Sequence, residues 1–490
     1  MTAWLSLSAL WSLCSARALQ TVSASLPSCL AQAGVPFLVS DSSDWAGEIM
    51  PYNVRLNYTP AAVAMPQSVA QIQAAVSCGV RNRARITAKG GGHSFGSFGL
   101  GGEDGHLVIG FEHMRRVVVK DDNTATIQAG ARLLDVATEL YNQGRRALPH
   151  GSVGIAGHVL HGGFGYASRT HGLTLDWLTG ATVVLADASV VHCSAIENQD
   201  LFWALRGAGS SFGIVAEFEF DTFEAPNQVT SFSLDLPSWE RADAVEAISS
   251  LQRFAVSAPR ELNLMLDITP TDKTFQGVYY GNQRGLHEAL RPLLSDVGGN
   301  FSSASTVGWL EGLLKFDDLD PADPRDTFYA TSLVTRALDG GQIESLVSSL
   351  AAASPPSLRR SLYLSIEAHG GINSAVADVG SSATAYPHRD KLLLFQLFHG
   401  GSQGRYDDNG FGLVETVRRS VTDSVAGGEW GMYSNYLDTQ LDAPAAGELY
   451  WGSNLPRLRR IKADLDPYEV FWNPQGIQPA DSLYKAGYEL

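Results

Sequence analysis

The sequence predicts an α+β protein of two domains, the second of them an antiparallel sheet covered by helices. The first indication is length, because 490 residues are too many for one ordinary hydrophobic core. The second is a change in composition, since glycine is dense up to about residue 223 and sparse from there to about residue 430. The third lies inside that glycine-poor stretch. There, helical segments stand beside apolar strands, which favours helices packed on one face of a sheet.

Short strands and helices alternate in the first part of the chain. A helix is expected over residues 66–78, because a proline stands at its start and Val69, Ile72 and Val76 form one apolar stripe. A second helix is expected over residues 132–142. Strands are expected at residues 85–88, 107–111, 117–120 and 124–128.

The next stretch, residues 151–172, is crowded with glycine and is expected to be mostly loop. Beyond it, apolar strands at residues 181–185 and 189–193 flank a turn and predict a hairpin. A short helix over residues 200–206 and an alternating strand over residues 212–220 complete this region.

The glycine-poor stretch predicts longer elements. Helices are expected at residues 242–257, 286–295 and 342–353, and strands at residues 263–269, 361–367 and 392–398. From about Trp430 this pattern stops, and the C-terminal part is expected to return to the first domain. The predicted divisions are 1–18 (a signal peptide), 19–228 (first domain), 229–430 (second domain), 431–478 (return to the first domain) and 479–490 (a tail).

The net charge and the N-terminal segment indicate which partners and which compartment to expect. A net charge of -16 repels nucleic acid and anionic membranes, whereas it is compatible with a neutral substrate such as a sugar. An apolar run ending in Ala16-Arg17-Ala18 is typical of a secretory signal, which predicts an extracellular protein; a buried N-terminal helix is the alternative. No other stretch is long and apolar enough to cross a membrane.

Secretion makes the four cysteines interpretable. Cys14 would leave with the signal, so Cys29 and Cys78 are the expected disulfide, and Cys193 in an apolar strand is expected to be a buried free thiol. Two sequons, at Asn57 and Asn300, predict glycosylation in exposed loops.

One loop carries the strongest chemical signal. Gly90-Gly91-Gly92-His93 follows the strand at residues 85–88, and three glycines leave their backbone N–H groups free to wrap an anion. More glycine follows, so no helix start is available to bind phosphate, which argues against the nicotinamide-type fingerprint. A glycine-rich surface turn with an incidental histidine is the alternative.

The loop resembles the pyrophosphate loop of the vanillyl-alcohol-oxidase (p-cresol-methylhydroxylase) flavoproteins. Four segments match that family in order, at residues 89–102, 150–176, 200–215 and 473–475. Within it the chain is similar to the berberine-bridge-enzyme-like branch, and most similar to fungal gluco-oligosaccharide and chito-oligosaccharide oxidases; further shared runs lie at residues 384–392 and 430–436. The resemblance implies a p-cresol-methylhydroxylase-type FAD-binding domain followed by an α+β substrate domain. It also implies a secreted monomer that oxidises the C1 hydroxyl of a saccharide to a lactone and reduces oxygen to hydrogen peroxide.

The resemblance also implies which residues hold FAD. His93 matches the histidine bonded covalently to the flavin. The other implied contacts are Lys89, Gly90, Gly91, Gly92, Ser94, Ser97, Phe98, His150, Gly151, Ser152, Gly154, Gly157, His158, Gly163, Gly165, Gly213, Ile214, Val215 and Asn473. Doubly attached relatives carry a cysteine where this chain reads His150-Gly151-Ser152-Val153-Gly154, so we expect attachment through His93 alone.

Oxidising an alcohol also requires a base for the hydroxyl proton, and a tyrosine with its ordinary pKa near 10 needs a neighbour to serve as one. By resemblance the base is Tyr436, and Glu367 stands where relatives have an aspartate; a packed core tyrosine and a surface carboxylate are the alternatives. The implied substrate contacts are Gln396, Tyr433, Phe95 in place of a tyrosine, and Ser365 in place of a glutamine. Trp430 and Tyr433 would join Tyr436 in a sugar-stacking wall or in the core.

Three expectations concern what else the site does. His158 and His161 have zinc-like spacing, but the surrounding glycines offer no rigid helix face and no third ligand stands out, so no metal is expected. By the same resemblance, the segment around Leu178 would lie beside the flavin and affect the access of oxygen. Leucine is bulkier than the valine typical of good oxidases, so an electron acceptor other than oxygen stays open. A different alcohol, such as a secondary metabolite, or a flavin-loaded protein without turnover also stays open.

Overall fold

The computed structural model describes residues 25–151, 153–236, 240–269, 272–316, 325–352, 362–400 and 406–480, without the side chains of 314–316. The predicted signal peptide, Ser152 and residues 481–490 of the predicted tail lie outside the described residues. Across the described ranges, no helix has both the length and the apolar character needed to span a bilayer.

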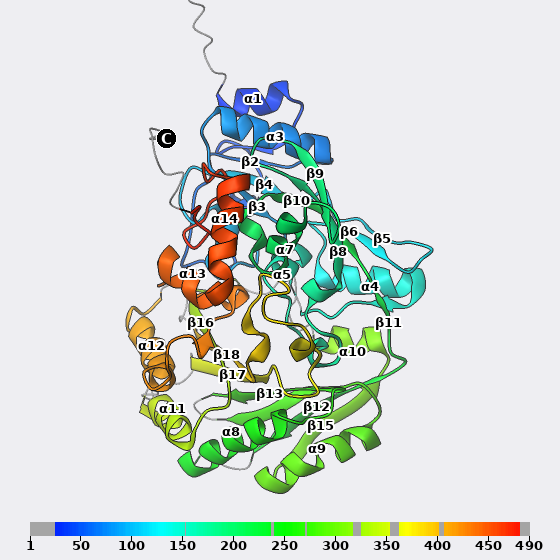
Figure 1. The fold of residues 1–490 in the computed structure, drawn as a ribbon, viewed down its shortest axis with the longest axis vertical. Helices are drawn as coiled ribbons and strands as arrows, with labels where there is room; N and C mark the ends of the chain where they lie inside the picture. The colour runs from blue at the N-terminus through cyan, green and yellow to red at the C-terminus, as the bar shows by residue number, and fades with distance from the viewer. Residues whose placement is uncertain are drawn as a thin grey trace, which may run out of the picture.

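Two sheets form the half of the molecule at the top of Figure 1. The four-stranded sheet has the order β1-β2-β4-β3, in which β2, β4 and β3 are parallel. The five-stranded sheet has the order β5-β6-β10-β8-β9 and is antiparallel throughout. The strands are β1 (Phe37–Leu38), β2 (Ala62–Ala64), β3 (Ile86–Lys89), β4 (Leu107–Gly110), β5 (Val117–Val119), β6 (Ala125–Gln128), β8 (Leu178–Val184), β9 (Val190–Ser194) and β10 (Ile214–Phe220), with a separate pair β7 (Arg146–Ala147) and β11 (Phe223–Glu224).

Helices connect and cover these sheets. They are α1 (Leu26–Gln32), α2 (Trp45–Glu48), α3 (Val69–Arg81), α4 (Leu133–Gly144), α5 (Ile155–Leu160), α6 (Ser168–His171) and α7 (Gln199–Ala208). The predicted start of α3 at residue 66 is three residues early, because Ser68 is the N-cap and its hydroxyl accepts the Gln71 N–H at 3.3 Å. The predicted Cys29–Cys78 disulfide is confirmed and joins α1 to α3, and Cys193 is a buried free thiol in β9.

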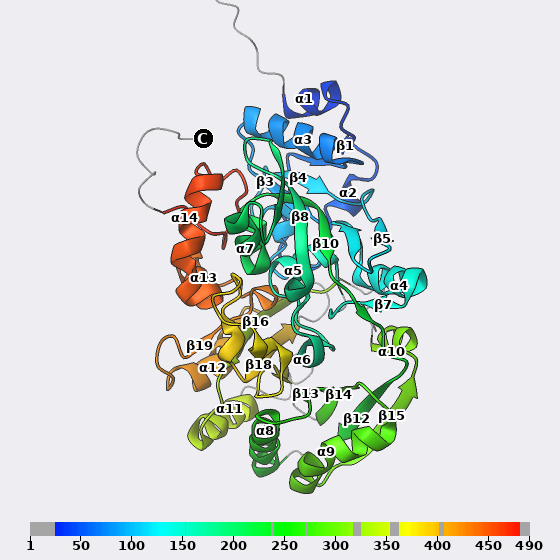
Figure 2. The same ribbon diagram turned by 45° about the vertical axis from the view of Figure 1, so that its right-hand side comes forward.

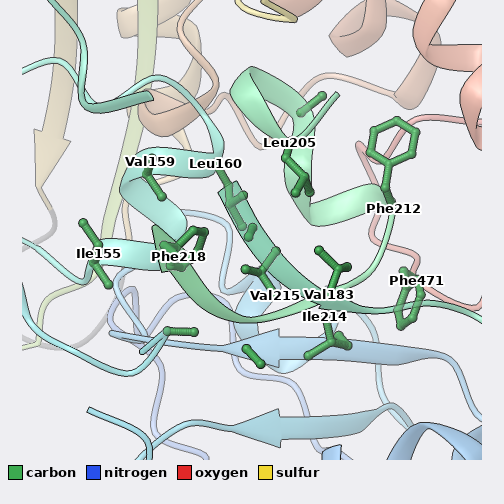
Figure 3. Close-up of a cluster of buried hydrophobic side chains, with 14 of the residues drawn as sticks. Ile155, Val159, Leu160, Val183, Leu205, Phe212, Ile214, Val215, Phe218 and Phe471 are labelled. Carbon is green, nitrogen blue, oxygen red and sulfur yellow. The ribbon is translucent and has the colours of Figure 1, made fainter. Parts of the chain in front are cut away.

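The prediction of loop over residues 151–172 is wrong in two places, since α5 and α6 lie there. Glycine content indicated a loop, but the apolar residues of α5 bury against the five-stranded sheet. Figure 3 shows Ile155 and Leu160 of α5 in one buried cluster with Leu205 of α7 and Val215 and Phe218 of β10. Burial of this apolar face therefore outweighs the local preference of the glycines.

The C-terminal segment packs on the same half. Helices α13 (Ala443–Trp451) and α14 (Leu455–Leu465), red in Figure 1, lie beside the N-terminal elements in both ribbon views (Figures 1 and 2). The Ile86 N–H of β3 donates to the Val470 carbonyl at 2.8 Å, and the buried Lys462 ammonium donates to the Ser211 carbonyl at 2.7 Å. The predicted domain limits at residues 228 and 430 stay predictions.

The other half is one eight-stranded sheet with the order β15-β12-β14-β13-β17-β18-β16-β19, antiparallel at every pairing. Its strands are β12 (Val229–Asp235), β13 (Leu262–Ile268), β14 (Lys273–Tyr279), β15 (Asn300–Val307), β16 (Phe328–Thr335), β17 (Leu362–Ala368), β18 (Leu393–Gly400) and β19 (Trp430–Gly431). Figures 1 and 2 show helices α8, α9, α11 and α12 on the face turned away from the first half. These helices are α8 (Arg241–Ala255), α9 (Gln283–Val297), α11 (Gly340–Ala352) and α12 (Asn409–Thr422), and α10 (Trp309–Phe316) lies nearer the first half. The predicted α+β fold is confirmed.

Both sequon asparagines are exposed. Asn57 lies outside regular structure, as predicted. Asn300 is the first residue of β15, an edge strand, so the expectation of a loop there is wrong.

A buried arginine fastens the two halves together. Arg169 of α6 is fully buried, and its guanidinium donates to the carbonyls of Leu262 (2.9 Å), Ala258 (3.1 Å) and Gly370 on the other half. Buried carbonyls that lose their donors cost about 1–3 kcal/mol each. We expect Arg169→Met to lower the free energy of unfolding by about 3 kcal/mol or more, as measured by urea denaturation.

The matched control is Arg260→Met. Arg260 also lies between the halves, where it contacts the Thr170 carbonyl at 3.2 Å, but its guanidinium is exposed. An exposed ion pair contributes at most about 1 kcal/mol, so this variant should unfold almost like the parent. Equal losses in the two variants would contradict the role given to Arg169.

Candidate functional site

A cavity of about 510 Å³ lies between the two halves and collects most of the residues singled out from the sequence. Its size is that of small-molecule and cofactor sites in general. The predicted residues that line it are Lys89, Gly90, Gly91, Gly92, His93, Ser94, Phe95, Phe98, Gly151, Gly154, Gly157, His158, Gly165, Gly213, Ile214, Val215, Ser365, Glu367, Gln396, Tyr433, Tyr436 and Asn473.

Three predicted contacts do not reach this cavity. Ser97 is buried, and its hydroxyl lies 3.5 Å from the Asn53 carbonyl. The Gly163 N–H donates to the Tyr433 hydroxyl, and His150 lines a separate, smaller cavity. These corrections arise because neighbours in a motif point in different directions once the chain folds.

Glycine allows two loops to meet at one wall of the cavity. A Cβ on Gly91 would lie 2.8 Å from the Gly154 Cα, and a Cβ on Gly154 would lie 2.6 Å from the Gly91 Cα. Arg132 supports the same wall, since its guanidinium donates to the Gly91 carbonyl at 2.9 Å. Gly157 also lines the cavity, and a Cβ there would meet nothing within 4 Å. At these glycines the backbone itself faces the cavity. A side chain at the same positions would occupy part of the cavity.

His93 lies on this wall as a neutral imidazole. Burial, and to a smaller extent the positive charge of Arg132, lowers the pKa of His93 to about 4. The His93 ring stacks on Tyr52, with ring centroids 3.6 Å apart and an interplanar angle of 27°. A neutral ring nitrogen keeps the lone pair that a nucleophile needs. Lys89, at the end of β3, pairs its ammonium with Glu48 at 2.5 Å.

The opposite wall is the face of the eight-stranded sheet that is turned toward the first half. Along β17 the sequence alternates, so Leu364 and Ile366 pack in the core under the helices while Tyr363, Ser365 and Glu367 line the cavity. The register pairs Ser365 with Gln396 of β18 and Glu367 with Met265 of β13. The side chains on this wall of the cavity therefore come from three adjacent strands.

Tyr436 and Glu367 meet in this cavity although 69 residues separate them. Tyr436 ends a short 3₁₀ turn, Ser434–Tyr436, and its hydroxyl donates to the Glu367 Oε1 at 3.3 Å. Burial raises the pKa of the Glu367 carboxyl to about 8, which the hydrogen bond from Tyr436 partly opposes. Burial and the nearby Glu367 charge raise the pKa of Tyr436 well above 10. Above a pH of about 8 the pair therefore holds a single proton, on the phenol oxygen beside the cavity.

Of the two alternatives for the aromatic cluster, the core holds for Trp430, whereas Tyr433 and Tyr436 line the cavity. Phe95 stacks on Tyr436 with an interplanar angle of 10°. The Tyr433 hydroxyl accepts hydrogen bonds from the N–H groups of Gly163 and Phe164 and from the Asn435 side chain. Tyr433 therefore holds the backbone of Gly163 and Phe164 in place. Trp430 packs with both hydrophobic cores and does not line the cavity, and neither does the buried Leu178.

The sequence reasoning missed several lining residues. Tyr52 lies in an irregular segment and gave no signal. Met265 and Tyr363 could have been found from strand alternation, because each lies two residues from another lining position. Tyr363 is held in place by Asp267, whose Oδ1 accepts its hydroxyl at 2.6 Å.

The two histidines with zinc-like spacing are engaged in other contacts. His158 Nε2 accepts the Gly151 N–H at 3.1 Å, and the His161 ring contacts the Gly157 carbonyl and the Ser210 hydroxyl. In the part of the chain that the structure describes, no three His, Cys, Asp or Glu side chains gather as metal ligands would.

Comparison with known proteins agrees with this geometry. Residues 60–194 match the FAD binding domain family, and residues 432–478 match the berberine and berberine-like family. Chitooligosaccharide oxidase of Gibberella zeae is 44% identical over 92% of this chain and 94% of its own length. The chain belongs to the berberine-like FAD-linked oxidases. It is therefore an FAD-linked oxidoreductase with an FAD-binding domain.

Two further members of this family bear on the site. FAD-linked oxidoreductase dpmaF of Metarhizium anisopliae is 45% identical over 92% of this chain and 91% of its own length. A solved structure of glucooligosaccharide oxidase from Acremonium strictum is 42% identical, covers 93% of this chain and 99% of its own, and superposes with a TM-score of 0.89. That protein is described with a 6-S-cysteinyl, 8α-N1-histidyl FAD.

Proposed function

We propose that this oxidoreductase converts the C1 hydroxyl of an oligosaccharide to a lactone and passes the electrons to oxygen as hydrogen peroxide. The observation that carries the proposal is the hydrogen bond between Tyr436 and Glu367 inside the cavity, because it supplies a base beside a substrate-sized space. The relatives named for chito- and gluco-oligosaccharides support the substrate class.

The residues present fit FAD. The wall formed by Gly90 to Gly92 and Gly154 presents backbone to the cavity, and the space beside Gly157 is open. No acidic side chain is among the residues with which the first half lines the cavity. We infer that this wall, with His93, Ile214, Val215 and Asn473, holds the cofactor. When bound, FAD accepts the hydride that leaves the alcohol carbon.

We propose attachment of FAD through His93 alone. The neutral His93 ring lies at the cavity, whereas each cysteine in the described ranges is accounted for elsewhere: Cys29 and Cys78 in their disulfide, and Cys193 buried in β9. No described cysteine lines the cavity. This chain would therefore differ from the glucooligosaccharide oxidase that carries a second, cysteinyl bond.

The protein's own residues handle the hydroxyl proton. A substrate hydroxyl next to Tyr436 gives its proton to the phenol oxygen as the phenol proton moves to Glu367 Oε1, so no free phenolate is needed. Gln396 and Ser365, adjacent across β17 and β18, are placed to orient the sugar's other hydroxyls. Phe95, stacked on Tyr436, limits the movement of its ring.

Three further aspects belong to the proposal. Secretion is supported by the Cys29–Cys78 disulfide, which requires an oxidising compartment, and by the exposed sequons at Asn57 and Asn300. The monomeric state rests on the resemblance alone. Neither nucleic acid nor a membrane is an expected partner, because the net charge is -16.

The test is peroxide release from a panel of cello-, xylo- and chito-oligosaccharides in air, with flavin bleaching followed without oxygen. Peroxide and lactone from at least one saccharide would support the proposal. Anaerobic bleaching by a saccharide without peroxide in air would overturn oxygen as acceptor. Flavin bleaching by non-sugar alcohols alone would overturn the substrate class. It would favour oxidation of a secondary metabolite, a function that the apolar Phe95 and Met265 in the cavity suggest.

The pKa of Glu367 predicts the pH dependence of the rate. Below a pH of about 8 the carboxyl is protonated and cannot accept the Tyr436 proton, whereas above that pH it can. We expect kcat/KM to rise about tenfold per pH unit on the acid side and to level off near pH 8.

Glu367→Gln keeps the shape of the side chain but cannot accept a proton. The variant should therefore lose the rise of kcat/KM with pH and have a lower kcat/KM at its plateau. The control is Glu344→Gln on the exposed side of α11, which should keep the parent profile. A pH profile unchanged in Glu367→Gln would exclude the carboxylate as proton acceptor.

A further inference from the structure

A second, small cavity lies between the two halves of the molecule. Its volume is about 10 Å³, and its lining comes from the segment around His150 on one half and from Tyr280 and Trp309 on the other. Tyr166 lines both this cavity and the large one, so the two cavities are neighbours. The other lining residues of the small cavity include the apolar Val229 and Leu313, which belong to a small hydrophobic cluster.

Three polar atoms on these lining residues have no hydrogen-bond partner among the residues that the structure describes. They are His150 Nε2, the Tyr280 hydroxyl and Trp309 Nε1, each buried from solvent. His150 is 6% exposed and Trp309 is 3% exposed. A buried polar atom without a hydrogen bond costs about 1–3 kcal/mol, so three such atoms at one cavity require an explanation.

Their hydrogen-bonding roles are complementary. His150 Nδ1 lies 2.6 Å from the Gly151 carbonyl, which only accepts, so the ring proton is on Nδ1 and Nε2 is an acceptor. Burial lowers the pKa of His150 and so keeps this neutral tautomer. Trp309 Nε1 only donates, and the Tyr280 hydroxyl can donate. The set therefore offers two donors and one acceptor.

We propose that this cavity is a binding site for a single structural water. A water accepts hydrogen bonds from Trp309 and Tyr280 on its two lone pairs and donates one hydrogen to His150 Nε2. One water needs a cavity of about 10–15 Å³ and two to four polar partners, and this site provides both. A halide only accepts hydrogen bonds, so it would face the acceptor nitrogen Nε2 of His150 without a bond.

The water would also position a residue of the large cavity. His150 holds the Gly151 carbonyl, and the Gly151 N–H donates to Nε2 of His158, which lines the large cavity. The water thus links Tyr280 and Trp309 of one half to His158 of the other. This inference does not depend on which substrate the enzyme oxidises.

The direct test is a crystal structure of the whole protein at a resolution that shows water, with a parallel bromide soak. A single water within hydrogen-bond distance of all three atoms is the expected result. An empty cavity, a bromide peak in it, or direct bonds among the three side chains would overturn the proposal.

Histidine NMR on ¹⁵N-labelled protein gives a second readout that does not depend on activity. The His150 signals are assigned by their loss in His150→Gln. We expect the Nε2 resonance of His150 to shift in both Tyr280→Phe and Trp309→Phe, because each change removes one donor from the shared water. The control is Tyr141→Phe, in the same apolar cluster but outside the cavity, which should leave the resonance in place. An unshifted Nε2 resonance in both cavity variants would also overturn the proposal.

Discussion

Replacing Tyr436 with phenylalanine should nearly abolish sugar oxidation, with kcat falling about 100- to 10,000-fold. The substitution removes the hydroxyl that donates to Glu367 Oε1 in the cavity and leaves the ring that stacks on Phe95. The substrate hydroxyl then has no base within reach, because a carboxylate 3.3 Å beyond the phenol oxygen does not replace it. The measurement is anaerobic flavin bleaching in a stopped-flow instrument, which isolates the reductive step.

The cofactor content is the internal check on this result. Tyr436→Phe should keep the parent's absorbance spectrum and thermal midpoint, since the variant alters no described contact of the glycine wall. The matched control is Tyr468→Phe, an equal chemical change on an exposed tyrosine. Bleaching at the parent's rate in Tyr436→Phe would exclude this residue as the base.

Replacing His93 with alanine should release all of the flavin when the protein is denatured. In the parent we expect yellow acid-precipitated protein, with the added mass on the peptide that contains His93. In His93→Ala the pellet should be colourless, because no described cysteine lines the cavity to form a second bond. The measurement is the intact mass and the absorbance of the pellet and supernatant after acid precipitation.

His287→Ala is the control for this experiment, because His287 is exposed on α9 and outside the cavity. It should keep its flavin in the pellet. A parent peptide that carries flavin on a cysteine, or a coloured pellet from His93→Ala, would contradict attachment through one histidine.

Glu367 illustrates how far local pattern reaches. A strand was predicted at residues 361–367, and the structure has a strand there. In any strand, alternate positions such as 363, 365 and 367 share one face. The pattern could not tell a surface carboxylate from a buried one. That depends on which elements cover the face, and here the first half of the molecule covers it, which raises the pKa of Glu367 to about 8.

His150 illustrates the opposite case. The motif around residues 150–154 implied a cofactor contact, yet the ring lies in a different cavity from its neighbours Gly151 and Gly154. Successive residues of an irregular segment have no fixed direction, because no repeating backbone geometry sets it. A motif therefore identifies the segment that forms a site, but the residues that face the ligand have to be taken from the fold.

The amino-acid sequence by itself determined the fold class, the Cys29–Cys78 disulfide, the glycine-rich loop at His93 and the family, because these follow from composition, cysteine count and ordered motifs. Only the tertiary structure decided that Tyr436 reaches Glu367, that Tyr433 is held by backbone, and that Tyr52 lies against His93. Each of these contacts joins segments far apart in the chain. The packing of the two halves on one another sets the distance between Tyr436 and Glu367, and the packing within the first half sets the other two contacts. No local pattern encodes either.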